Sequence, residues 1–97
     1  MVVYRISKVL DNEGNERIKF RDTLVYIYVI RTGCSAILPY IERTGKAIST
    51  SIVKEITMIT DDFVEFKTDN SKYLLFREYE DEVEMLFDVN DVRVFYN

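Results

Sequence analysis

The chain has no histidine, and its only cysteine is Cys34. Histidine is the commonest general base and the commonest zinc ligand, so its absence argues against ordinary acid–base catalysis and against a zinc site. A lone cysteine cannot form a disulfide within the chain and is typical of a reducing compartment. We therefore expect a cytoplasmic, non-enzymatic protein with no catalytic, cofactor-binding or metal-binding residues.

Proline and glycine are also scarce, with Pro39 as the only proline and three glycines. No long uninterrupted apolar run is present, which argues against a signal peptide and against a membrane span. Turns must then be formed mainly by the Asp- and Asn-rich segments at residues 11–16, 61–62 and 69–70. The 97 residues, 47% of them hydrophobic, suffice for one core, so we predict a single domain over residues 1–97.

Apolar and polar side chains alternate along much of the chain, as in half-buried strands. Residues 24–30 are apolar on both faces, which predicts a central strand covered on both sides. Pro39 places the next strand at an edge or a bulge. We predict strands at residues 2–10, 17–20, 24–30, 35–41, 63–68, 72–79, 83–87 and 92–96.

Two segments allow both a strand and a helix. In residues 46–60, isoleucines recur at helical spacing, but most of the apolar and hydroxyl side chains are β-branched and no capping box is present. We predict one long strand there, with a helix as the alternative. In residues 79–87, Tyr79, Val83 and Leu86 lie at helical spacing among good helix formers, so a helix competes with the predicted hairpin.

The number of short strands predicts a mainly β fold, a small antiparallel barrel or sandwich with at most one short helix. In the C-terminal half, three meandering strands precede a one-turn helix at residues 88–91 and a closing strand. This strand order is similar to that of SH3-like and Sm-like barrels. A fold of this kind is compatible with many functions, so the function must be argued from the surface.

Charge is spread unevenly, and tyrosine is frequent, with seven residues. Residues 1–60 carry nine basic and six acidic side chains, whereas residues 61–97 carry four basic and eleven acidic ones. Tyrosine and arginine are preferred anchors of protein interfaces, and a polarised charge distribution can mark a binding face. We predict an interaction surface that comprises Tyr26, Tyr28, Arg31, Glu78, Glu80, Asp81, Glu82 and Glu84.

Residues 50–56 (TSIVKEI) and 68–73 (TDNSKY) together resemble a pattern in short β-rich proteins of bacterial phages and other mobile elements. The pattern extends from residue 50 to residue 73, which is about a quarter of the chain. The resemblance implies a small accessory or regulatory protein that acts by binding. It assigns no functional residue.

These observations predict a binding module that contacts another protein, with the acidic segment at residues 78–84 facing a basic partner. A homodimer formed through an exposed edge strand is a further arrangement open to a small β domain. The alternative function is binding of single-stranded nucleic acid, with Tyr26 and Tyr28 stacking bases and Arg31 holding phosphate. The net charge of −4 argues against this alternative. An enzyme or small-ligand protein would require a pocket with converging polar groups.

Overall fold

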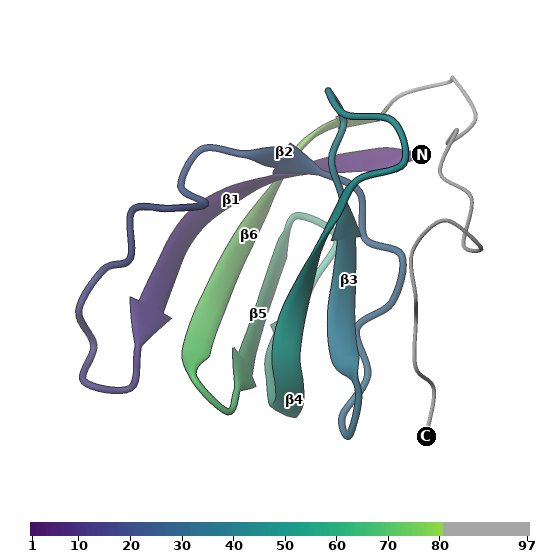
Figure 1. The fold of residues 1–97 in the computed structure, drawn as a ribbon. Coiled ribbons are helices and arrows are strands. Elements are labelled where there is room, and N and C mark those ends of the chain that lie inside the picture. Colours follow the sequence, from purple (N-terminus) through teal and green to yellow (C-terminus); the bar gives the residue numbers. More distant parts are fainter. Residues whose placement is uncertain (81–97) are drawn as a thin grey trace.

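The computed structural model describes residues 1–80, and this part of the chain is built from antiparallel strands without a helix (Figure 1). The mainly β prediction is therefore confirmed. Within residues 46–60, the segment Ala47–Ile59 forms the 13-residue strand β4, so the predicted strand is confirmed and the helix alternative is wrong. The strands are β1 (Val2–Asp11), β2 (Leu24–Val25), β3 (Ser35–Pro39), β4 (Ala47–Ile59), β5 (Phe63–Thr68) and β6 (Ser71–Glu80).

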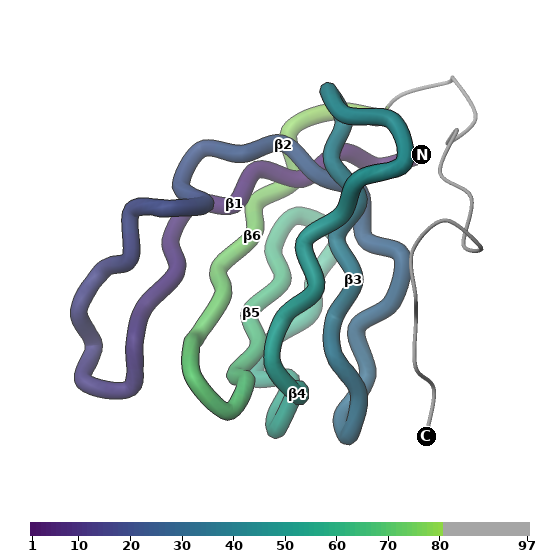
Figure 2. Tube along the Cα trace, viewed as in Figure 1, coloured from purple at the N-terminus to yellow at the C-terminus, as the bar shows by residue number. Residues whose placement is uncertain are grey.

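The six strands are ordered β2-β1-β6-β5-β4-β3, and they curl into a nearly closed barrel (Figures 1 and 2). Strand β4 forms the corner, because its first half pairs with β3 and its second half pairs with β5. The pairing with β5 shifts register between Val53 and Glu55, where the strand changes partner. Such irregularities let a strand bend sharply enough to close a small barrel.

Residues 24–30 close the barrel between β1 and β3, but only Leu24 and Val25 form a regular strand. Val25 lies opposite Tyr4 of β1 and also bridges to Tyr40, beyond the end of β3. From Tyr26 onward the backbone bonds to β3 instead, with the Tyr26 amide donating to the Pro39 carbonyl at 2.9 Å. The predicted seven-residue strand is thus wrong in extent, because the segment changes partner after two residues.

The predicted return strand at residues 17–20 is also wrong. The Arg17 amide donates to the Val9 carbonyl at 2.6 Å, and the chain then leaves β1. Successive turns follow, with the Arg21 amide bonded to the Ile18 carbonyl at 3.1 Å. Asp22 has a positive φ of 64°, which no regular strand contains.

The core lies inside the barrel and is formed by the inward-facing side chains of the strands. Phe66 of β5 is completely buried and stacks on Tyr73 of β6, with ring centroids 5.0 Å apart. Burial raises the pKa of the Tyr73 hydroxyl. Around this pair pack Ile6, Val9, Val25, Ala36, Leu38, Ile48, Val53, Val64 and Leu75.

The β4–β5–β6 meander of the C-terminal half is confirmed, with turns at residues 61–62 and 69–70 as predicted. The predicted short helix at residues 88–91 and the strands at 83–87 and 92–96 lie outside the described residues. Tyr79 and Glu80 belong to β6, and the rest of the segment 79–87 is likewise outside. In the described part of the chain, no helix is long and apolar enough to cross a membrane.

Candidate functional site

The predicted aromatic part of the interaction surface does not form one exposed patch. Tyr26 is only 8% exposed, so its ring offers no open face for stacking. Tyr28 is half-buried and lines an apolar cavity. Arg31 is exposed, and its Nη2 lies 3.3 Å from the Sγ atom of buried Cys34. The three residues therefore have different environments, although they lie within six positions of the sequence.

The predicted acidic part already has cations beside it within the chain. The Arg5 guanidinium donates to the Glu78 carboxylate, and this bond holds the pKa of Glu78 below its usual value. Arg77 contacts the Glu80 carboxylate at 3.3 Å. Both carboxylates are thus partly neutralised before any partner arrives. Asp81, Glu82 and Glu84 lie outside the described residues.

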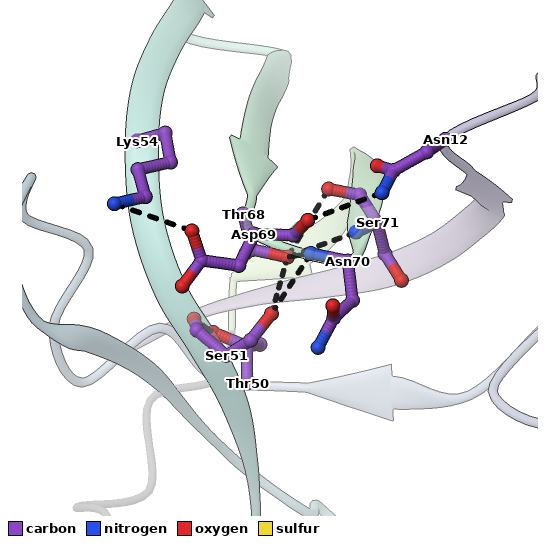
Figure 3. Close-up of polar contacts among 8 residues, drawn as sticks. All are labelled: Asn12, Thr50, Ser51, Lys54, Thr68, Asp69, Asn70 and Ser71. Carbon is purple, nitrogen blue, oxygen red and sulfur yellow. Dashed lines mark hydrogen bonds and ion pairs between the residues drawn. The ribbon is translucent and has the colours of Figure 1, made fainter.

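The two sequence stretches at residues 50–56 and 68–73 meet at the β5–β6 turn (Figure 3). The Thr68 hydroxyl lies 2.7 Å from the Ser51 hydroxyl and accepts a hydrogen bond from the Ser71 amide at 3.1 Å. Lys54 forms a 3.2 Å ion pair with Asp69. Because these groups satisfy one another, the network fixes the turn against the bend of β4 and has a structural role.

Large hydrophobic side chains are exposed mainly at one end of the barrel, where β1 and β5 begin and β4 and β6 end. Of the seven such side chains in residues 1–80, five lie at this end. We call these five the apolar end: Met1, Met58, Ile59, Phe76 and Tyr79. Ile59 is 65% exposed, although the pleat of β4 turns it inward beside buried Val64. Scattered single hydrophobic side chains are normal, but a group of this kind marks an interaction site.

A cavity of about 580 Å³ opens at the apolar end. Its wall is mostly hydrophobic and includes Met1, Tyr4, Ile27, Ile59 and Val64. At the same end, on the outer face of the sheet, Phe63 and Phe76 pack with ring centroids 4.7 Å apart. This size falls within the range of binding pockets, and the lining suits apolar side chains.

The rim of the apolar end is acidic. Asp61 and Asp62 are exposed in the turn between β4 and β5, and neither forms an ion pair with another residue of the described part. Sequence analysis identified these residues only as a turn. The hydrophobic group was also missed, because alternation predicts which face a side chain occupies and not whether that end of the barrel is covered.

Comparison with protein-family models, with curated proteins and with solved structures finds no match to this chain. Within residues 1–80, no three side chains of the metal-binding types come together in a group that could hold an ion. The candidate site is therefore assigned from the structure of residues 1–80 alone, and it is the apolar end with its acidic rim.

Proposed function

We propose that the protein is a non-enzymatic binding module, an accessory or regulatory factor whose apolar end docks a partner protein. The exposure of Met1, Met58, Ile59, Phe76 and Tyr79 at one end of the barrel, where Met1 and Ile59 also line an apolar cavity, carries this proposal. Large apolar and aromatic side chains gathered around a hollow are the usual anchors of protein interfaces. Covering them removes apolar area from water, which favours association.

The acidic rim specifies the chemistry of the partner. Asp61 and Asp62 are exposed without a cation from the described residues, whereas Glu78 and Glu80 are bonded to Arg5 and Arg77. A partner segment with apolar anchors flanked by lysine or arginine would complement both the cavity and the rim. Rim charges of this kind set the rate and specificity of association more than its strength.

Selection from a random peptide library tests the proposal. We expect the full-length protein to enrich peptides with apolar residues next to lysine or arginine. The variant Ile59→Asp should bind these peptides at least about tenfold more weakly, because it places a carboxylate at the cavity. Ile18→Asp is the matched control, since Ile18 is 71% exposed in a loop away from the apolar end. Equal binding by both variants would overturn the proposal.

Two further measurements exclude other occupants of the apolar end. Sedimentation of the protein alone should show a monomer, and a dimer that Ile59→Asp dissociates would assign this surface to a second copy of the chain. A synthetic peptide with the sequence of residues 81–97 should not displace the selected peptides. Displacement sensitive to Ile59→Asp would assign the surface to the chain's own C-terminal segment and would refute the partner proposal.

A further inference from the structure

A second cavity, of about 480 Å³, lies between the loop before β2 and the loop after β3. Phe20, Leu24 and Tyr40 supply its apolar lining. Arg5, Lys19 and Arg43 bring cationic groups to it, and Asp22 and Glu42 bring carboxylates. Phe20 and Tyr40 also pack against the core, so the barrel holds their rings in place. Segments about twenty residues apart thus place rings and cations in one cavity.

The two loop cations rest on the two rings. Lys19 Nζ lies 5.2 Å from the centroid of the Phe20 ring, and Arg43 Cζ lies 5.4 Å from the centroid of the Tyr40 ring. Neither cation forms an ion pair with another residue of the described range, whereas Arg5 is bonded to Glu78. Exposed cation–π contacts are weak, so a ligand can displace both side chains at little cost.

We infer that this cavity binds a nucleoside phosphate, independently of the partner site at the apolar end. A planar base takes the ring faces of Phe20 and Tyr40, and the displaced Lys19 and Arg43 bind the phosphate. At the same cavity, the Glu42 carboxylate and the Thr23 hydroxyl can accept N–H groups from the edge of a base. The volume lies within the range of small-ligand sites.

This arrangement replaces the stacking surface expected from Tyr26 and Tyr28. Tyr26 is buried and cannot stack a base, but Phe20 and Tyr40 each pair a ring with a cation that can move. The nucleoside phosphate is either a free nucleotide or one unit of a single strand. Both sources offer the same base and phosphate, so the experiment must separate them.

NMR titrations of the full-length protein with adenosine monophosphate, inorganic phosphate and single-stranded oligoadenylate test the inference. We expect adenosine monophosphate to shift the amide signals of residues 19–24 and 40–43. The variant Lys19→Gln/Arg43→Gln should raise the Kd at least about tenfold. The control Lys8→Gln/Lys67→Gln removes the same charge from exposed strand positions outside this cavity and should change the Kd less than about twofold.

Tyr40→Leu removes the ring while keeping an apolar side chain. It should weaken the binding of adenosine monophosphate more than the binding of inorganic phosphate. If oligoadenylate binds more tightly than adenosine monophosphate and with a strong salt dependence, the ligand is a nucleic-acid strand. If the two bind with equal affinity, the ligand is a free nucleotide. No shift at millimolar ligand, equal binding of inorganic phosphate, or equal losses in the two double variants would overturn the inference. Ile59→Asp should leave these affinities unchanged, so this test and the partner test fail separately.

Discussion

Replacing Thr68 by valine removes one hydroxyl from the β5–β6 turn and leaves the shape of the side chain almost unchanged. Thr68 and Ser71 are 6% and 7% exposed, and the Ser71 amide donates to the Thr68 hydroxyl at 3.1 Å. In the valine variant this buried amide loses its acceptor, and Ser51 loses its 2.7 Å partner. The cost arises from lost hydrogen bonds, because valine fills the same space.

Leaving one buried donor unsatisfied costs about 1–3 kcal/mol. Ser51 is only half-buried, so water can replace part of its lost bond. We therefore expect Thr68→Val to lower the free energy of unfolding by about 2 kcal/mol. For a domain of this size, that loss corresponds to a fall in Tm of about 8–16 °C.

Urea unfolding followed by tyrosine fluorescence or circular dichroism measures this loss. The midpoint should fall by about 1–2 M, with the slope unchanged. Thr44→Val serves as the control, because Thr44 is exposed, and such surface changes alter stability by less than about 0.5 kcal/mol. The double variant Thr68→Val/Ser51→Ala should lose less stability than the sum of the losses in the two single variants, because both substitutions break the same Ser51–Thr68 hydrogen bond. A Thr68→Val protein as stable as Thr44→Val would refute the role assigned to the network.

Two further perturbations test the sheet and the turn before β3. Thr57 and Lys72 hold the pKa of Glu65 below its usual value, so its carboxylate stabilises the fold at neutral pH. That contribution is lost as the pH falls through the lowered pKa, so the stability difference between wild type and Glu65→Gln should shrink between pH 7 and about pH 3. Gly33 has a φ of 87° and donates to the Val53 carbonyl at 2.9 Å. Gly33→Ala should cost about 1–2 kcal/mol in urea unfolding, entirely from backbone strain, because a Cβ there meets no atom within 4 Å.

Sequence patterns predicted the strands whose pairing partners are close in the chain. In β5, and in β6 as far as Leu75, buried side chains alternate with more exposed ones on either side of Asp69-Asn70, so local turn chemistry and pleating give the same answer. In β4, β-branched side chains favoured a strand over the helical spacing of its isoleucines. These elements follow from residues a few positions apart.

Strand β1 was also predicted from its own alternation, although its partner β6 is distant in the chain. Patterns failed where the outcome depends on how distant segments come together. Residues 24–30 are apolar on both faces because they close the barrel, but their change of partner from β1 to β3 depends on two distant strands. The Arg5–Glu78 pair joins residues 73 positions apart, so the sequence did not reveal that a carboxylate of the acidic segment is bonded to an arginine of the same chain. The cavity beside Phe20 and Tyr40 likewise depends on two loops that the barrel brings together.

The two ends of the barrel differ in the groups that they expose to water, and this difference supports a binding role. At the end with the β5–β6 turn, Asn12 and Arg17 donate to the carbonyls of Asp69 and Asn70, and Gly33 bonds to the bend of β4. Loops from three parts of the chain thus satisfy polar groups there. Within residues 1–80, the opposite end instead leaves Ile59 exposed at a cavity and Phe76 exposed on the outer face of the sheet. A fold that closes one end with hydrogen bonds and exposes apolar anchors at the other gains most from a partner at the second end, because most of the exposed large hydrophobic side chains of residues 1–80 lie there.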